Sequence, residues 1–446
     1  MKTWLSITPA VLFAGAVLMA APLDARAQAG EEARPISLAD AIKQAQRNAP
    51  AVVQARGLQR NGVAARRSAL GAYLPTLNFN MSTNQTKGVQ YFQGALVPLT
   101  GNPWNYNNSI STNIQIFDGM ARWQELKRVD AQQVVADYTE TQARFDAELS
   151  VKQQYFAALA ARESEAAAKA QLEQAEQQLK ASSARVTAGV ATKSDSLRSA
   201  IQVGNAQLAV LTAQNDLRVA NANLTRVVGS PTTVTAIAED TSDVLTPIPG
   251  EAELEKMLAD GPSVQLANAS VESAKASKRA QKSSYFPTVS MSYSFNLTQG
   301  SQAFSPSDVW LLSGSSPNRK NLGFSLQYPI FNGFSRESQS VNQDVALRNA
   351  EAQARDAHLA ARANLTSLLR QAQNAEARVR VQMQAIAAAD EDLRVQQQRY
   401  ALGASTLLDL LASQTALNQA RQALIQARFD GRVTRAQLAA LLGKPL

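Results

Sequence analysis

The sequence predicts a mainly α-helical chain with four amphipathic β-strands, built by tandem duplication. Long segments rich in Ala and Gln carry apolar residues at the helical period. Short segments between them alternate apolar and polar residues, as strands do when their two faces meet different surroundings. Five motifs recur in the same order 212 to 214 residues later, and self-similarity at a fixed spacing indicates two copies of one structural unit.

The recurring motifs divide the 446-residue chain into two structural repeats. We expect the first repeat at 28–230 and the second at 251–446, joined by a linker at 231–250 that contains three Pro residues. The offset changes from 212 to 214 between the second and third motifs, where the loops are expected to differ. The matched segments are 48–50 with 260–262, 73–77 with 285–289, 116–119 with 330–333, 189–195 with 403–409, and 224–229 with 438–443.

The N-terminal segment 1–27 predicts a secretory signal peptide. Lys2 precedes an apolar run at 11–21, and an A-x-A cleavage site ends at Ala27. After this segment, no run of about 18 apolar residues predicts a membrane-spanning helix. The mature chain is therefore expected to cross the inner membrane without remaining in it.

Composition argues against several classes of function. The net charge of +8 is spread along the chain and not gathered into Lys/Arg blocks, so no nucleic-acid partner is predicted. With no Cys and one His, the sequence predicts no metal site of the zinc type. It contains no Gly-x-Ser-x-Gly motif, P-loop or His-based metal pair. We therefore expect neither an enzyme nor a cofactor.

Each repeat contains two predicted strands. The first strand of the first repeat alternates Leu77, Phe79 and Met81 with Asn and Ser, and the other strands follow the same rule. The paired strands are joined by connections of about 25 residues, a length typical of the outer loops of membrane barrels. The strands are expected at 76–84, 107–117, 288–298 and 320–331.

A long helical hairpin follows each second strand, at 119–229 and 333–443. The outgoing helix of about 70 residues is roughly 105 Å long, because each helical residue adds about 1.5 Å. Gly189 and Gly403 mark the tips, since Gly ends a helix in the left-handed conformation without a Cβ clash.

Asp195 and Asp409 fall in the first turn of the two returning helices. Two interpretations are open for these carboxylates. They stabilise the positive end of the helix dipole in any case. They are also candidates for lining a pore, if the helices enclose one.

Strands and helices together predict a conduit. A strand in lipid needs every backbone group paired, so only a closed barrel can span a membrane. Outer-membrane barrels begin at about eight strands, so four strands per chain require several chains. Two chains leave an interior wide enough only for side chains. Three or four chains leave a lumen, and this arithmetic alone does not separate them.

The duplicated hairpin, the Gly-x5-Asp tips, Tyr-x-Pro before each first strand and Phe-(Asp/Asn)-Gly after each second strand resemble the TolC-like outer-membrane efflux and secretion channels. The resemblance implies a homotrimeric channel-tunnel with a twelve-stranded β-barrel in outer-membrane lipid. It also implies a long α-helical barrel that projects into the periplasm. The implied partners are a periplasmic adaptor protein and an inner-membrane transporter of the RND, MFS or ABC type.

The resemblance also implies roles for individual residues. Gly189 and Gly403 match the tip turns that the adaptor contacts. Tyr400 matches a Tyr that helps to hold the periplasmic entrance shut. Asp409 matches a carboxylate of the entrance, and Asp195 matches the Asp of the other tip.

The chain departs from the best-known members of that family at two positions. Ala412 stands where they have a second Asp, and Ser405 stands where they have an Arg. Closure of the entrance is therefore expected to rest on fewer polar links, or on packing of Leu407, Leu408 and Leu411.

We expect an outer-membrane exit duct of a tripartite efflux system that passively passes small molecules or toxic compounds. The alternative is the outer-membrane channel of a type I protein secretion system. A coiled-coil structural protein or surface adhesin would lack paired strands with period 2. Because the duct has no energy source of its own, its sequence does not identify the substrate.

Overall fold

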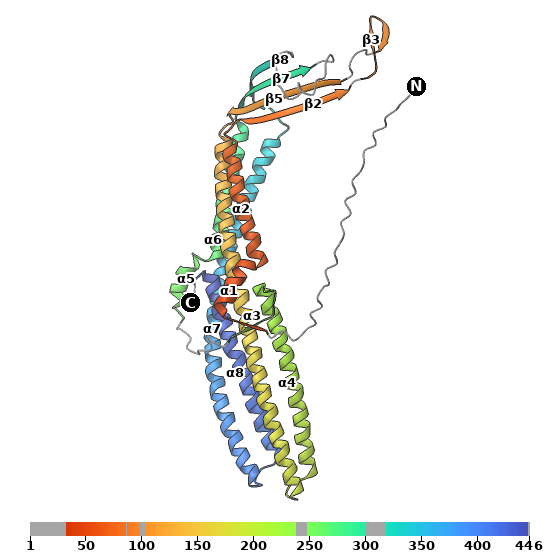
Figure 1. The fold of residues 1–446 in the computed structure, drawn as a ribbon. Coiled ribbons are helices and arrows are strands. Elements are labelled where there is room, and N and C mark those ends of the chain that lie inside the picture. Colours follow the sequence, from red (N-terminus) through yellow and green to blue (C-terminus); the bar gives the residue numbers. More distant parts are fainter. Residues whose placement is uncertain (1–32, 86, 99–103, 238–247, 300–317, 445–446) are drawn as a thin grey trace, which may run out of the picture.

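The computed structural model shows an elongated molecule with a β-sheet at one end and two helical hairpins that run to the other end (Figure 1). The signal peptide expected at 1–27 lies outside the described part of the chain, as does half of the linker expected at 231–250. The described residues are 33–85, 87–98, 104–237, 248–299 and 318–444.

Two strands from each repeat form one antiparallel sheet in the order β2-β5-β7-β8. The central pair, β5 with β7, joins the two repeats. β8 stops short of the expected end at 331, because Pro329 has no N–H to donate to a strand ladder. The strands are β2 (Thr76–Gln85), β5 (Trp104–Phe117), β7 (Thr288–Gln299) and β8 (Asn318–Gln327).

The loop between β2 and β5 contains a second hairpin that the sequence analysis did not predict. β3 (Val89–Phe92) pairs with β4 (Ala95–Pro98) through a two-residue turn. Gln93 and Gly94 both have positive φ, 50° and 82°, as the tightest hairpin turns require. A Gln is rarely found in this conformation, so the turn signal in the sequence is weak.

The helices begin and end where local signals place them. Pro50 and Pro262 are the first residues of α2 and α6, a position that needs no backbone N–H. Gly229 and Gly443 end α4 and α8 in the left-handed conformation. The described residues form α1 (Leu38–Asn48), α2 (Pro50–Gly71), α3 (Ala121–Thr187), α4 (Lys193–Val228), α5 (Glu251–Leu258), α6 (Pro262–Gln281), α7 (Ser335–Ala401) and α8 (Leu407–Leu442), with a 3₁₀ turn at Lys282–Tyr285.

The helices form a single curved wall. In the half next to the sheet, α2 packs on α3, α3 on α6 and α6 on α7. In the half with the tips, α4 packs on α3, α3 on α8 and α8 on α7. None of the helices in the described segments is long and apolar enough to cross a membrane.

The largest apolar core lies at mid-height, where the short elements join the hairpins. Tyr155 and Leu159 of α3 pack there against Leu224 of α4 and Phe429 of α8. The linker contributes β6 (Val234–Ala236), which pairs in parallel with β1 (Arg34–Ile36). The Tyr155 hydroxyl donates to the carbonyl of Ile237 at 2.8 Å and anchors this pair. β1 and β6 have only three residues each, which is too short for a periodic pattern. The sequence therefore did not predict this strand pair.

The duplication is visible in three dimensions at the same offsets as in the sequence. Leu77 opposes Thr112 in the first repeat, and Val289 opposes Leu326 in the second, so the strand register within the repeats is identical. An ion pair also recurs at equivalent positions. Arg66 pairs with Asp130 at 2.9 Å, and Lys278 pairs with Asp344 in the second repeat.

Candidate functional site

Both hairpin tips turn by the same backbone mechanism. At the first tip, Gly189 has a φ of 78° and its N–H bonds to the carbonyl of Val186. The next N–H, from Val190, reaches back to the carbonyl of Arg185 at 3.0 Å. This pair of bonds is the Schellman motif, which satisfies the last carbonyls of a helix. The second tip repeats it around Gly403, whose φ is 74°.

A capping box opens the returning helix at each tip. The Thr192 backbone N–H donates to the Asp195 carboxylate at 3.1 Å, and the Asp195 N–H donates to the Thr192 hydroxyl at 3.3 Å. Thr406 and Asp409 make the same two bonds at 3.0 and 3.2 Å. Both predicted Asp residues are therefore helix-capping groups in the folded subunit, whatever further role they have in a pore.

The capping interactions also set the charge of the second tip. Hydrogen bonds from the Thr406 hydroxyl, and then from the Thr406 N–H, lower the pKa of Asp409 below its ordinary value of 3.8. The positive charge of Arg399 acts in the same direction. Asp409 therefore carries a full negative charge at any pH near neutrality.

Tyr400 joins the two tips through a residue that the sequence analysis missed. Its side chain packs on a small apolar cluster of the second hairpin that includes Leu393, Leu407 and Leu410. Arg185 of the first hairpin donates to the Tyr400 carbonyl at 2.9 Å. The guanidinium also lies over the Tyr400 ring, 4.6 Å from its centroid. Such a contact combines a charged hydrogen bond with a cation–π interaction.

The missed residue carries a recognisable signal. Arg185 lies four residues before Gly189, and Arg399 lies four residues before Gly403. The family resemblance implies an Arg two residues after the tip Gly, where this chain has Ser405. The arginine that links the tips comes instead from the preceding helix.

The sheet at the other end has the two faces that a membrane strand needs. Leu77 and Phe79 of β2, with Phe324 and Leu326 of β8, are exposed large apolar side chains. Alternate positions hold small polar residues, and the hydroxyls of Ser290 and Ser325 lie 2.7 Å apart. Among the described strands, β2 and β8 each pair on one side only. In the part of the chain that the structure describes, the sheet is therefore open at both edges, and none of its side chains is buried in an apolar core.

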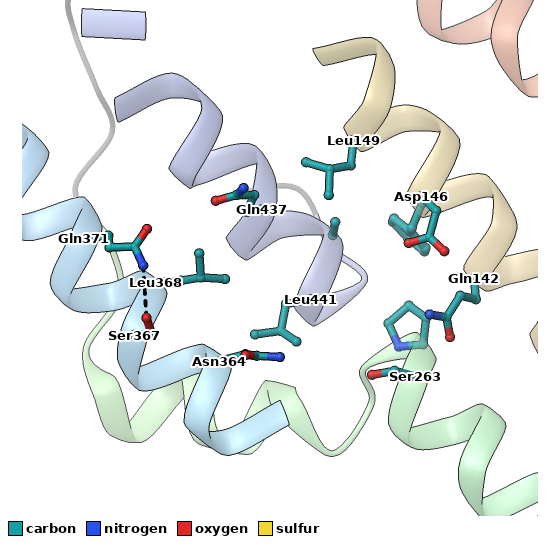
Figure 2. A pocket seen from close by; sticks show the side chains of 13 residues that line it. Gln142, Asp146, Leu149, Ser263, Asn364, Ser367, Leu368, Gln371, Gln437 and Leu441 are labelled. Atoms are coloured by element: carbon teal, nitrogen blue, oxygen red, sulfur yellow. Dashed lines mark hydrogen bonds between the residues drawn. The ribbon is translucent and has the colours of Figure 1, made fainter. Parts of the chain in front are cut away.

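An open cavity of about 490 Å³ lies at mid-height between the two hairpins. Figure 2 shows Gln142 and Asp146 of α3 facing Asn364 and Ser367 of α7 across it. Burial raises the pKa of Asp146 above its ordinary value of 3.8, while a hydrogen bond from Gln142 acts against this. Within the described segments, no three His, Cys, Asp or Glu side chains gather in a way that could hold a metal ion.

Comparison with known families decides what this arrangement belongs to. The sequence model of the outer membrane efflux protein family matches residues 41–230 and 254–444, one segment for each repeat. The chain belongs to this family. Its members work in tripartite systems with a periplasmic adaptor and an inner-membrane pump.

Curated relatives of this efflux protein are distant in sequence. The outer membrane protein TolC of Escherichia coli K12 is 24% identical over 351 residues, which cover 76% of this chain and 70% of TolC. The cobalt-zinc-cadmium resistance protein CzcC of Cupriavidus metallidurans is 25% identical over 314 residues, or 69% of this chain and 70% of CzcC. The pyoverdine export protein OpmQ of Pseudomonas aeruginosa is 26% identical over 284 residues, or 63% and 57%.

Solved structures agree with the fold over nearly the whole chain. A structure of CusC superposes with a TM-score of 0.78 at 17% identity and covers 91% of this chain and 92% of that one. VceC of Vibrio cholerae gives a TM-score of 0.74 at 17% identity, with 92% and 96% covered. These likenesses confirm the predicted fold class, a helical tunnel that continues a β-barrel.

Family membership confirms the main predictions about function. The efflux protein is a transport duct of the outer membrane and not an enzyme. Its helical hairpins project into the periplasm, and its sheet lies in the membrane. The roles of Gly189, Gly403, Asp195, Tyr400 and Asp409 stay predictions.

Proposed function

We propose that three copies of the chain form a closed duct through which small molecules leave the periplasm. The open four-stranded sheet is the observation that carries this proposal. β2 and β8 run in opposite directions, since each neighbouring pair in the four-stranded sheet is antiparallel. The β8 edge of one copy can therefore pair with the β2 edge of the next. Three copies give twelve strands and a lumen, whereas two give only a filled barrel.

The helical wall supports the same ring. Its two flanks, α2 and α4 on one side and α7 on the other, carry rows of exposed apolar side chains. A monomeric soluble protein rarely exposes such rows, and a neighbouring copy would cover them. The exposed residues are Val53, Leu58 and Val63 on α2, Leu197, Ile201, Leu208 and Leu211 on α4, and Val341, Val345, Leu359 and Val381 on α7.

The junction between sheet and helices supports the placement of the periplasmic membrane surface. Arg122 lies over the Tyr73 ring at 5.0 Å, and Arg336 lies over the Tyr285 ring at 5.1 Å. Trp123, the residue after Arg122, is also exposed. Aromatic residues flanked by cations concentrate at the membrane–water interface, where one end of the ring is apolar and the other is wet.

We assign the periplasmic entrance and the adaptor contact to the tips. Gly189 and Gly403 are exposed, and a Cβ added at either glycine would meet no atom of the described residues within 4 Å, so a partner can approach the backbone closely. Val190 and Leu402 beside them are large exposed apolar residues. The buried hydroxyl of Tyr400 has no hydrogen-bond partner in the described residues, as expected if other copies or water complete the entrance.

The proposed substrate class is inferred from the names of two relatives. CzcC is named for cobalt, zinc and cadmium resistance and OpmQ for pyoverdine export, so both names refer to small solutes. They favour efflux of small or toxic compounds over type I protein secretion. A pump of the RND, MFS or ABC type would supply the energy and the selection.

Planar-bilayer recording of the purified outer-membrane protein tests the proposal. We expect a trimer that resists SDS until heated and that conducts ions across the bilayer. A water-soluble monomer without conductance would contradict the duct. Co-encoded genes for an adaptor with a proton-driven pump, as opposed to a secretion ATPase, would separate efflux from protein secretion.

Blocking the channel with Mg²⁺ tests the entrance assignment. Asp409→Ala removes a permanent negative charge and should weaken block by the divalent cation. Asp195→Ala is the matched variant, because it removes the same capping box from the other tip. Unchanged block in Asp409→Ala would remove this residue from the entrance.

A further inference from the structure

We infer that the mid-height cavity between the two hairpins is a lumenal binding site for small organic cations with an apolar body, such as primary amines that carry one aromatic ring. The inference rests on the proposed duct and narrows its solutes to a chemical class. It concerns the space of about 490 Å³ between α3 and α7, here called the wall cavity. Of the 13 described residues that line it, none is Lys, Arg or His.

The wall cavity lies where two helices meet end to end. α8 ends at Leu442 and α6 begins at Pro262, while α3 and α7 both pack on these two helices and run past the joint. The two ends are in close contact, since a Cβ built on Gly443 would lie 2.9 Å from the Cδ of Pro262. The end of α8 carries a partial negative charge and the start of α6 a partial positive one. These partial charges offset each other at the joint, so the side chains decide which ions the cavity favours.

Asp146 is the charged residue among the described residues that line the wall cavity. It is solvent-exposed and has no ion-pair partner in the described part of the chain. Two lysines of an adjoining hollow are already paired, Lys152 with Glu148 at 2.7 Å and Lys444 with Asp260 at 3.2 Å. The cavity therefore holds a negative charge for which these segments supply no counter-ion.

The surroundings of Asp146 favour a cation that brings its own apolar surface. Burial raises the pKa of Asp146, so the site disfavours the bare carboxylate, and a bound cation would offset this. The amide oxygens of Asn364 and Gln371 can accept hydrogen bonds from an ammonium group. Leu149 and Leu368 point into the cavity from opposite sides and can cover an apolar body (Figure 2). A few polar groups on an apolar lining are typical of sites for small organic ligands.

The wall cavity lies on the face of the helical wall opposite the short elements. Successive residues of a helix are about 100° apart. On α7, Leu365 and Leu369 pack against α5, and Ser367 points nearly the opposite way. On α3, Tyr155 packs beneath the β1–β6 pair, and Asp146 lies on the opposite side of the helix. In the proposed ring the short elements lie outside, because three such layers would fill the bore. The wall cavity therefore faces the lumen.

Ligand-observed NMR on the purified trimer tests the site with three probes that share an aromatic ring and differ in charge. The probes are 2-phenylethylammonium, 2-phenylethanol and phenylacetate. We expect the wild type to bind the ammonium probe most tightly. Asp146→Asn keeps the shape of the side chain and should weaken binding of this probe by at least about tenfold, because a charge-assisted hydrogen bond is lost. Binding of 2-phenylethanol should not change.

Three controls separate this site from unspecific attraction of cations. Asp216→Asn removes the same charge from an exposed position on α4 and should leave the affinity for the ammonium probe unchanged. Ser367→Phe occupies part of the cavity and should weaken binding of the ammonium and alcohol probes alike. Mg²⁺ at matched ionic strength should not displace the ammonium probe, because one carboxylate is too few for a divalent ion. Displacement by Mg²⁺ would overturn the assignment to organic cations.

Planar-bilayer recording tests whether the wall cavity faces the lumen. The ammonium probe should reduce the open-channel current of the wild type from either side, and Asp146→Asn should need about tenfold more probe for the same reduction. Binding through Asp146 without any effect on the current would overturn the lumenal placement.

Failure of the site and failure of the duct give different results. Equal affinity of the ammonium probe for the wild type and Asp146→Asn would overturn the site, and so would tighter binding of phenylacetate than of the ammonium probe. Either result in a trimer that conducts would leave the duct intact. A protein that never conducts would overturn the proposed duct itself.

Discussion

Gly119 and Gly333 occupy the same place in the two repeats and share one backbone conformation, with φ of 65° and 66°. Their surroundings differ. A side chain on Gly119 would overlap Phe286, whereas one on Gly333 would meet nothing in the described part of the chain. The first repeat is flanked by the second, and the second is flanked by open space. The two repeats thus present the same surface beside these glycines. Within one chain, only the surface of the first repeat is covered by a neighbour.

The two tip arginines show the same asymmetry. Arg185 of the first repeat crosses to Tyr400 of the second. Arg399, its equivalent, donates to the carbonyl of Ala404 in its own loop, at 3.3 Å. Arg185 therefore links the two hairpins, whereas Arg399 bonds within its own tip.

The glycine pair gives the largest expected effect. Gly119→Ala should lose about 1–2 kcal/mol to the left-handed conformation and about 1–3 kcal/mol more to overlap with Phe286. Gly333→Ala should lose a similar amount if a neighbouring copy in the proposed ring covers Gly333 as Phe286 covers Gly119. Gly189→Ala is the matched control, because it has the same positive φ with free space around it. The temperature at which the trimer dissociates in SDS measures the loss, and a Gly333→Ala variant no worse than Gly189→Ala would break the equivalence.

The lipid-facing strands come next. Phe324→Arg on β8 should cost each chain about 2–4 kcal/mol, the cost of an Arg facing the middle of the bilayer. Ile110→Arg on β5 should behave alike, because the ring places the edge strand and the inner strand in the same lipid. Ser325→Arg, one residue away, points to the lumen and should be tolerated. The yield of folded trimer in lipid measures all three, and equal loss in Phe324→Arg and Ser325→Arg would contradict the assignment of the faces.

A moderate effect is expected at the tips. Arg185→Gln removes a hydrogen bond from a charged donor, a contact worth about 1.5–3 kcal/mol, and should raise the fraction of time the channel conducts fully. Arg399→Gln should act in the same direction but less, because Arg399 donates to the Ala404 carbonyl of its own loop and not to the other hairpin. Arg185→Lys keeps the charge and should recover part of the closure. Single-channel recording measures the fraction of time that each variant conducts fully. An unchanged fraction in Arg185→Gln would mean that the Arg185–Tyr400 contact does not help to close the channel.

The smallest effect concerns the cavity, which the first repeat lines with Asp146 where the second has Ala360. The pKa of Asp146 is raised, so protonation favours the folded state. Its contribution to stability is present below pH 3.8 and is lost as the pH rises through the raised pKa. Asp146→Asn should therefore raise the melting temperature slightly at neutral pH but not at pH 3. Asp216→Asn, at an exposed site on α4, is the control, and a lower melting temperature in Asp146→Asn at neutral pH would contradict the expectation.

Short-range chemistry explains which features were predictable. The tip glycines and the aspartates in the first turn of the returning helices act within a few residues, so the sequence alone predicted them. Strand alternation is equally local and predicted the apolar face of the sheet. Duplication then made each of these signals appear twice.

Contacts between distant residues account for what was missed. Arg185 and Tyr400 lie 215 residues apart, and no local pattern links them. The β1–β6 pair and the anchoring hydroxyl of Tyr155 likewise join segments that only folding brings together. The turn of the β3–β4 hairpin has Gln where a stronger signal would have Asn or Gly.

The repeats, the ends of the helices and the two faces of the strands could all be read from the order of the amino acids, because each depends on residues a few positions apart. Which flank is packed and which is open became clear only from the folded chain. That choice depends on which surfaces meet when two similar halves fold against each other, and one chain cannot satisfy both of its own edges.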